Sequence, residues 1–264
     1  MKKILALGLL LCVGLFAQKL TIQGSTTVLP IAQAAAEAYM DDHPEADITV
    51  RGGGSGTGIA ALIDGATDIA DASRPMKEKE ITLAHERSID PVANIVARDG
   101  IAVIVHPNNP MNNIMKEDLK AIYTGEITSW EKISSAQDAI VVVSRDAASG
   151  TFEAFNELAL DKAKLSDAAL MLASNLEVAR TVAQTPGAIG YVGLGYLSDE
   201  VKAVKVNDIM PSESTVNDGT YPLARPLFMY TNGMPSGLAK DFLDFIMSAD
   251  GQTIVKEAGF VPIK

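Results

Sequence analysis

The sequence predicts an α/β protein in which short strands alternate with helices. Short apolar, often β-branched runs alternate with segments whose apolar residues recur every three or four positions. Glycine- or hydroxyl-rich turns separate a strand from the following helix at three places. This alternation is typical of largely parallel sheets with helices packed on their faces. The 264 residues are enough for one large or two small domains.

The first half of the chain contains four predicted strands and four predicted helices. The strands are Leu20–Gln23, Ile48–Arg51, Asp68–Ala72 and Ile101–His106, and the helices are Val28–Met40, Ile59–Ile63, Lys77–His85 and Lys116–Tyr123. Pro30 is compatible with a helix because it falls in the first turn. Gly65 and Gly125 follow two of the helices, where glycine commonly ends a helix.

The second half continues the alternation. Strands are predicted at Ile140–Ser144, Ala188–Val192 and Leu227–Tyr230, and helices at Thr151–Leu160, Leu176–Gln184 and Leu238–Met247. The last helix is amphipathic, since Leu238, Phe242 and Ile246 lie on one side of it. Such a helix packs its apolar side on a sheet.

The first seventeen residues have the pattern of a secretory signal peptide. Lys2 and Lys3 precede an apolar run from Ile4 to Phe16, and the small residue Ala17 follows. The run is shorter than the roughly 20 residues that span a bilayer. We therefore expect cleavage after Ala17 and export of the mature chain.

The single cysteine, Cys12, lies inside this segment. Leu11 precedes it, whereas a lipoprotein signal has a small residue there, so we expect a free protein rather than a lipid-anchored one. The mature chain would contain no cysteine and would fold without disulfides.

The chain is strongly acidic, with 22 Lys and Arg residues against 33 Asp and Glu residues. Loss of Lys2 and Lys3 would take the net charge from −11 to −13. Nucleic-acid binding rests on many basic contacts to phosphates, so this charge excludes nucleic acid as a partner. It does not exclude an anion bound in a buried site, because local donors govern capture there.

Three turns between a strand and a helix have the composition of anion sites. They are Gly24–Thr27, Gly54–Gly58 and Ser149–Thr151. Each places hydroxyls and unpaired N–H groups at a helix start, where the helix dipole favours negative charge. Ordinary helix capping explains any one such turn. Three of them predict an anion site only if they meet in space.

Two arginines follow predicted strands, Arg74 and Arg145. In open α/β sheets ligands bind beyond the carboxyl ends of strands, and a guanidinium there can hold an oxyanion by two hydrogen bonds. A surface salt bridge is the alternative role for each.

Several other chemistries lack their residues. The segment Gly52–Gly58 has no lysine for an NTPase phosphate loop, and its spacing does not fit the dinucleotide pattern or the G-x-S-x-G nucleophile turn. His43, His85 and His106 are far apart and fit no zinc spacing. The sequence therefore indicates no catalytic nucleophile, metal or other cofactor.

Eight short motifs in order resemble the substrate-binding protein of phosphate ABC transporters, the PstS-like group of periplasmic binding proteins. They are Gly24–Pro30, Gly53–Gly58, Asp68–Arg74, Ile122–Trp130, Arg145–Thr151, Pro186–Tyr191, Tyr221–Leu227 and Ala258–Pro262. The resemblance covers essentially the whole mature chain.

The resemblance implies a two-lobed, type II-like periplasmic binding protein that closes on its ligand by a hinge motion. Each lobe would be a mixed sheet flanked by helices, with two hinge strands near Ile101–Val105 and Leu223–Tyr230. The expected division is a signal peptide at 1–17, lobe I at 18–102 plus 225–264, and lobe II at 103–224.

The resemblance also implies a set of phosphate-binding residues. They are Ser25, Thr26, Thr27, Ser55, Ser73, Arg74, Arg145, Ser149, Gly150 and Thr151. Asp146 would orient Arg145. Some family members have an aspartate at the position of Ser73, where it accepts the proton of phosphate and rejects sulfate. Asp71 lies two residues earlier, on the same face of a strand, and is the candidate acceptor here.

The function expected from the resemblance is capture of inorganic phosphate in the periplasm and its delivery to an inner-membrane ABC permease. We expect a monomer that performs no chemistry. The alternatives are another tetrahedral oxyanion such as sulfate or molybdate, a secreted phosphatase, and a surface adhesin or structural protein.

Overall fold

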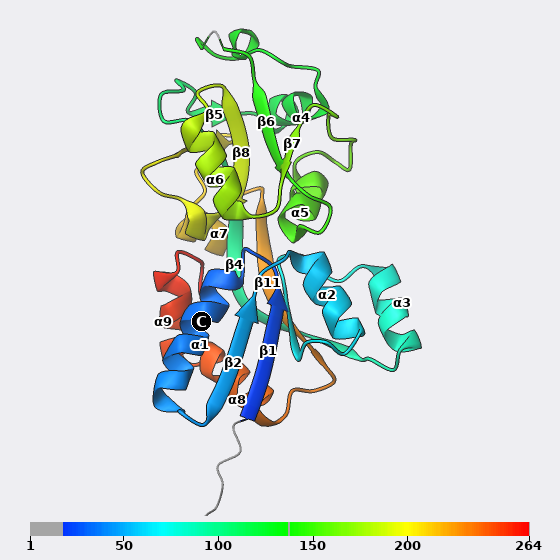
Figure 1. Cartoon of the computed structure of the whole chain (residues 1–264). Coiled ribbons are helices and arrows are strands. Elements are labelled where there is room, and N and C mark those ends of the chain that lie inside the picture. Colours follow the sequence, from blue (N-terminus) through cyan, green and yellow to red (C-terminus); the bar gives the residue numbers. More distant parts are fainter. Residues whose placement is uncertain (1–17, 137, 264) are drawn as a thin grey trace, which may run out of the picture.

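The computed structural model of the chain describes residues 18–136 and 138–263. Two lobes lie one above the other, and the long strand β4 (Pro91–Val105) and strand β11 (Ala224–Asn232) run where they meet (Figure 1). The predicted signal peptide and its cleavage site lie outside the described residues, so they remain predictions.

The remaining strands and the helices alternate along much of the chain. The strands are β1 (Gln18–Gly24), β2 (Ala46–Arg51), β3 (Ile69–Ala72), β5 (Asn113–Ile114), β6 (Val141–Arg145), β7 (Leu170–Leu172), β8 (Ala188–Gly193), β9 (Lys202–Ala203) and β10 (Lys205–Val206). The helices are α1 (Leu29–Asp42), α2 (Ser55–Ile63), α3 (Glu78–Glu86), α4 (Lys116–Thr124), α5 (Gly150–Leu158), α6 (Asn175–Gln184), α7 (Glu213–Asn217), α8 (Gly237–Met247) and α9 (Ala249–Glu257).

Strand β4 connects the two lobes because its two halves pair with different strands. Residues 91–100 pair with β11, whereas Ile101–Val105 pair with β8. The sheet order is β2-β1-β3-β11-β4-β8-β6-β7, with β9 also on β4. The pairing partner changes between Gly100 and Ile101, which places the crossing between the lobes there.

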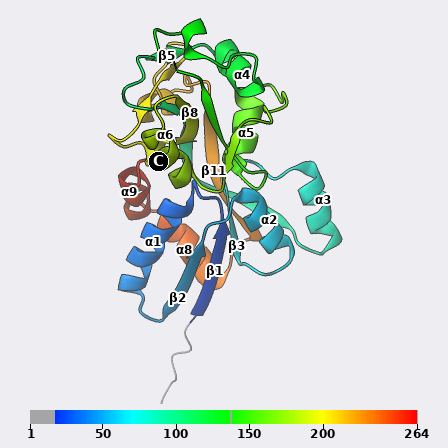
Figure 2. The same cartoon turned by 45° about the horizontal axis from the view of Figure 1, so that its top comes forward.

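The lower lobe in Figure 1 has an apolar layer on each face of its sheet. Helices α1, α8 and α9 cover one face, where Ile31, Phe242 and Val255 are buried. Helices α2 and α3 cover the other face, where Ile59 and Ala84 are buried (Figure 2). Alternate residues of β3 serve the two layers, as the period of two in a strand requires.

The upper lobe has the same plan. Helices α4 and α5 pack on one side around Trp130, Tyr123 and Phe155, and α6 packs on the other around Val178 and Val182. The rings of Phe155 and Tyr191 are stacked with centroids 3.9 Å apart. Most buried apolar side chains of each lobe therefore belong to clusters within that lobe.

The mixed α/β architecture expected from the sequence is confirmed, but the sheets are not largely parallel. Strands β1, β2 and β3 pair in parallel, as do β6, β7 and β8, whereas β11 and β4 are antiparallel to their neighbours. The antiparallel strands are the ones that return the chain between lobes. The boundaries of lobe I and lobe II given above stay a prediction.

Most predicted elements are present with shifted ends. The strand expected at Ile101–His106 is the second half of β4, and the helix expected at Ile59 begins at Ser55. Gly125 ends α4 with a left-handed backbone, φ +87°, as predicted. Helices α7 and α9 and the short strands β5, β7, β9 and β10 were not expected. In the described part of the chain, no helix combines the length and apolarity that crossing a bilayer requires.

Helix α2 lies against β1 through a glycine, which gives a test of this packing. A Cβ atom on Gly58 would lie 2.3 Å from the carbonyl oxygen of Gln23 and 2.6 Å from the Cα of Gly24. Gly58→Ala should therefore lower the free energy of unfolding by about 2 kcal/mol, since overpacking outweighs the gain in helix propensity.

Urea denaturation measures this change, and Gly56→Ala on the same helix is the control. A Cβ at Gly56 would meet its first neighbour, the carbonyl oxygen of Ala148, at 3.4 Å, an ordinary contact. Equal stability of the two variants would contradict the packing described here.

Candidate functional site

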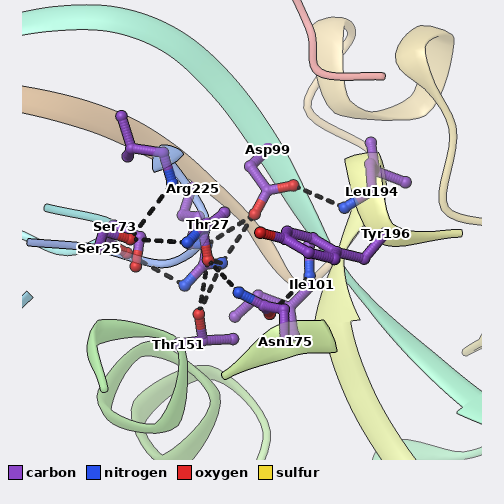
Figure 3. A network of polar contacts seen from close by, with 12 residues as sticks. Ser25, Thr27, Ser73, Asp99, Ile101, Thr151, Asn175, Leu194, Tyr196 and Arg225 are labelled. Atoms are coloured by element: carbon purple, nitrogen blue, oxygen red, sulfur yellow. Dashed lines mark hydrogen bonds and ion pairs between the residues drawn. The ribbon is translucent and has the colours of Figure 1, made fainter. Parts of the chain in front are cut away.

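The three glycine- and hydroxyl-rich turns meet where the lobes face each other. They precede helices α1, α2 and α5, so three helix N-termini converge. A backbone hydrogen bond from Gly56 N–H to the carbonyl of Ala148, 2.9 Å, joins the second turn to the third. Figure 3 shows the polar side chains that gather between them.

The first turn places two threonine hydroxyls in this cluster. Ser25 is buried, and its hydroxyl accepts from the N–H groups of Thr27 and Val28, which fixes the start of α1. Thr26 and Thr27 are thereby held with their side chains toward the upper lobe. The sequence predicted both residues in the site, and the structure brings both there.

Hydrogen bonds of Thr27 cross from the lower lobe to the upper one. Its hydroxyl lies 2.9 Å from that of Thr151 and 3.0 Å from the amide nitrogen of Asn175. Arg225 Nη2 donates to both threonine hydroxyls, at 3.3 Å and 3.1 Å (Figure 3). Thr27, Thr151 and Arg225 therefore form one connected group at the centre of the site.

The group contains more hydroxyl protons than acceptors that could bind them. A hydroxyl has one proton and two lone pairs. Asn175 donates to Thr27, Arg225 donates to both threonines, and either hydroxyl can be the donor in the bond between Thr27 and Thr151. Whichever hydroxyl donates, the proton of the other has no acceptor within the group. The hydroxyl of Thr26 also accepts two hydrogen bonds, from Arg145 and Asn175, so its proton is likewise without an acceptor in the group.

Arg145 is buried and lacks a carboxylate partner among the ion pairs of the described residues. Backbone carbonyls of Leu172 and Ala173 accept from its Nε and Nη2 atoms, at 3.1 Å and 2.8 Å. Its Nη1 atom is buried without a hydrogen-bond partner. Burial lowers the pKa of Arg145, because removal from water penalises the charged guanidinium. An anion bound at Nη1 would offset the free-energy cost of burying the charged guanidinium.

Arg225, in contrast, has a fixed counter-ion. Its Nε and Nη2 atoms donate to Asp99 Oδ2 at 3.0 Å and 2.8 Å, and the other oxygen accepts from Leu194 N–H at 2.9 Å. Both side chains are almost fully buried. Burial raises the pKa of Asp99, and the charge of Arg225 opposes that rise. Arg225 also donates to the carbonyl of Ser73 at 3.1 Å. Through its hydrogen bonds, strand β11 is connected to both lobes and to the polar cluster between them.

Ser55, Ser73 and Gly150 form the tight part of the contact between lobes. Ser55 Oγ accepts from Ser73 N–H at 3.0 Å and lies 3.4 Å from Ser73 Oγ. A Cβ atom on Gly150 would lie 2.2 Å from Ser55 Oγ, so only glycine permits this approach. Ser149 caps α5 by accepting from Phe152 N–H, which leaves the N–H groups of Gly150 and Thr151 free of intrahelical partners.

Arg74 was predicted as a ligand, but its guanidinium does not reach this cluster. It donates to both oxygens of Glu80 at 2.8 Å and to the carbonyl of Pro75, and it lies beside Glu153. The alternative left open by the sequence was a surface salt bridge; Arg74 does form ion pairs, but it is buried rather than at the surface. Strand position made both arginines candidate ligands, and the carboxylates of Glu80 and Glu153 beside Arg74 now distinguish the two.

The two supporting aspartates lie differently from expectation. Asp146 accepts from Ala148 N–H at 2.9 Å and makes no ion pair with Arg145, which the carbonyls orient instead. Asp71 is fully buried, and neither carboxyl oxygen has a hydrogen-bond partner. Burial raises the pKa of Asp71 well above its ordinary value. Its side chain does not join the polar network.

Asn175, Asp99 and Arg225 were missed from the sequence. Asn175 begins α6 after Ser174 and strand β7, so it belongs to a fourth turn of the same kind as the other three. Its amide oxygen accepts from Gly193 N–H at 3.3 Å, which directs the amide nitrogen to Thr26 and Thr27. Asp99 and Arg225 lie within strands, where a charged residue of each sign predicts a buried pair.

The arrangement is that of an anion-binding site. Threonine hydroxyl protons lack an acceptor in the group, three helix N-termini converge, and the guanidinium of Arg145 has an unpartnered nitrogen. Within residues 18–136 and 138–263, no group of three or more His, Cys, Asp or Glu side chains is placed to hold a metal ion.

Comparisons with known proteins identify the family of the chain. Residues 16–250 match the family model described as a PBP superfamily domain. The phosphate-binding protein PstS of Bacillus subtilis is 38% identical over 249 residues, which are 92% of this chain and 80% of the relative. The chain belongs to the PstS family of the PBP superfamily.

Solved structures of PstS-family proteins have the same fold. A Clostridium perfringens substrate-binding protein assigned to a phosphate ABC transporter, solved with phosphate bound, is 33% identical with a TM-score of 0.88. The match covers 94% of this chain and 100% of that one. An ABC-type phosphate transport receptor from Vibrio cholerae is 31% identical with a TM-score of 0.76, covering 92% of this chain and 99% of that one.

The unpartnered carboxyl of Asp71 predicts a pH effect on stability. Its pKa is raised in the folded chain, so the folded chain holds one more proton than the unfolded chain between the ordinary and the raised pKa. The free energy of unfolding then falls as pH rises through that window, by about 1.4 kcal/mol per unit of raised pKa. Asp71→Asn should abolish this fall and be more stable than the original chain at pH 8.

Thermal or urea unfolding from pH 4 to pH 9 measures the slope. Asp41→Asn, at an exposed position on α1, is the control and should keep the original slope. An unchanged slope in Asp71→Asn would show that this carboxyl is not the group responsible.

Proposed function

We propose that this protein captures inorganic phosphate between its two lobes and delivers it to an ABC permease. The observation that carries the proposal is the buried, unpartnered Nη1 of Arg145 beside the threonine hydroxyls at the lobe contact. The named relatives and the phosphate-bound Clostridium perfringens structure support phosphate as the anion.

The proposed binding residues come from both lobes. Thr26, Thr27 and Ser55 supply the lower lobe, Arg145, Gly150 and Thr151 supply the upper lobe, and Asn175 and Arg225 connect the two sets through Thr27. Charge-assisted hydrogen bonds contribute about 1.5–3 kcal/mol each, so several of them give micromolar or tighter binding. Hydroxyls can accept as well as donate hydrogen bonds, so Ser55 and Ser73 can accept a hydrogen bond from the O–H group that phosphate carries at neutral pH.

The protein is proposed to work outside the cytoplasmic membrane, in the periplasm if the cell has an outer membrane, after export by its signal peptide. We propose that it acts as a monomer without chemistry. The relatives are named as binding proteins rather than enzymes, which supports a role without chemistry. A secreted phosphatase would instead turn over a chromogenic phosphate ester, and loss of that turnover in Arg145→Ala would favour the enzyme.

Titration calorimetry with phosphate and with sulfate from pH 5 to pH 9 tests the ligand. Phosphate should bind at least tenfold more tightly than sulfate at pH 7, because sulfate has no proton to donate to Ser55 or Ser73. Equal affinities would favour a general oxyanion-binding protein, and tighter binding of molybdate would identify a different substrate.

Arg145 is expected to be the largest single contributor to affinity. Arg145→Ala should weaken phosphate binding more than 100-fold, since about 3 kcal/mol of charge-assisted bonding is lost. The cooperativity of unfolding should be retained. Arg180→Ala, at an exposed position on α6, is the control and should keep the original affinity. A loss below fivefold in Arg145→Ala would remove Arg145 from the site.

A further inference from the structure

Four charged side chains form an ion-pair cluster beside the anion site and across the lobe contact. We call Arg74, Lys77, Glu80 and Glu153 the latch cluster. Arg74, Lys77 and Glu80 come from the lower lobe, at and before the start of α3, whereas Glu153 comes from the first turn of α5 in the upper lobe. Nothing in the proposed capture of phosphate uses these residues.

Within the lower lobe, Glu80 holds Arg74 in a fixed orientation. Both carboxylate oxygens accept from the two Nη atoms of Arg74 at 2.8 Å, and one also accepts from Lys77 N–H at 2.8 Å. The pKa of Glu80 is lowered, since these bonds and charges outweigh the effect of burial. Arg74 therefore has a counter-ion in its own lobe, and its Nε atom is available for an ion pair with the other lobe.

Glu153 meets that atom from across the contact. Its Oε2 lies 2.5 Å from Arg74 Nε, as an ion pair whose atoms are not aligned for a hydrogen bond. Its Oε1 accepts from Lys77 Nζ at 2.7 Å. The Arg74 and Glu153 side chains are 6% and 17% exposed, so bulk solvent screens this pair only weakly.

The position of Glu153 along α5 links the cluster to the anion site. It lies three residues after Gly150, one helical turn from the N–H groups proposed to bind phosphate. Movement of the lobes apart would therefore withdraw α5 from the anion and from Arg74 together. On parting, Arg74 would keep Glu80 while Glu153 would gain water, so neither lobe is left with a buried unpaired charge.

We propose that the pairing of Glu153 with Arg74 and Lys77 is a latch that slows reopening of the closed lobes and so sets how long the ligand is retained. This rests on the proposed function, because retention is defined by the anion held between the lobes. The latch contacts no ligand, so it acts on the rate of dissociation and leaves the rate of association nearly unchanged.

Stopped-flow kinetics of Glu153→Gln with inorganic phosphate tests the latch. The variant keeps the size of the side chain and leaves the Arg74–Glu80 pair intact, so it should fold normally. We expect phosphate to dissociate about tenfold faster, with an association rate within twofold of the original. Lys77→Gln removes only the Lys77–Glu153 ion pair, the more exposed of the two, and should increase the dissociation rate less.

Glu157→Gln is the matched control. Glu157 lies one turn further along α5 and pairs at 3.1 Å with Lys162 of its own lobe, so its loss should leave both rates unchanged. Small-angle X-ray scattering with and without phosphate supplies a second readout. The original protein should become more compact with phosphate, and Glu153→Gln should need a higher phosphate concentration for the same compaction.

The outcomes separate the latch from the capture of phosphate. A chain that neither binds phosphate nor becomes more compact with it would overturn the proposed function. Normal binding and compaction combined with an unchanged dissociation rate in Glu153→Gln would overturn the latch alone. An equal effect of Glu157→Gln would also overturn it, because the loss of any negative charge on α5 would then suffice.

Discussion

Two buried arginines meet at the centre of this protein, and only Arg225 has a carboxylate partner, Asp99. A buried guanidinium without a counter-ion is costly, and Arg145 relies on backbone carbonyls and a threonine hydroxyl, with Nη1 left unpartnered. The surrounding arrangement follows from this surplus of positive charge. Three helix N-termini and unpaired hydroxyl protons add to it, so the lobes meet around a place suited to an anion rather than around an apolar core.

The hinge and the site share residues. Asp99 lies one residue before the change of pairing partner in β4, and Arg225 lies opposite it in β11. Through Arg225 the crossing strands contact Thr27 of one lobe and Thr151 of the other. Any change in the angle between lobes therefore changes the contacts of the proposed ligand groups, which is the coupling that hinge closure on a ligand requires.

The acidity of the chain and the anion site are compatible because they act over different distances. Net charge governs solubility and long-range steering, whereas dipoles and hydrogen bonds govern a desolvated site. Burial raises the pKa of Asp71, a buried acid two residues before Ser73, and so favours the neutral form of its carboxyl group. Glu153 is neutralised by Arg74 and Lys77 instead.

The sequence by itself determined the alternation of strands and helices, the three turns rich in glycine and hydroxyls, and the placement of Arg74 and Arg145 after strands. These are local features, since periodicity, capping and strand ends involve residues close together in the chain. Only the tertiary structure separated Arg145 from Arg74, found Arg225 and Asn175, and made β4 and β11 antiparallel to their neighbours. Glu153 lies 79 residues from Arg74, and Arg225 lies 198 from Thr27. Contacts over such separations depend on how the lobes pack, and no local pattern encodes which carboxylate or hydroxyl will face a given guanidinium.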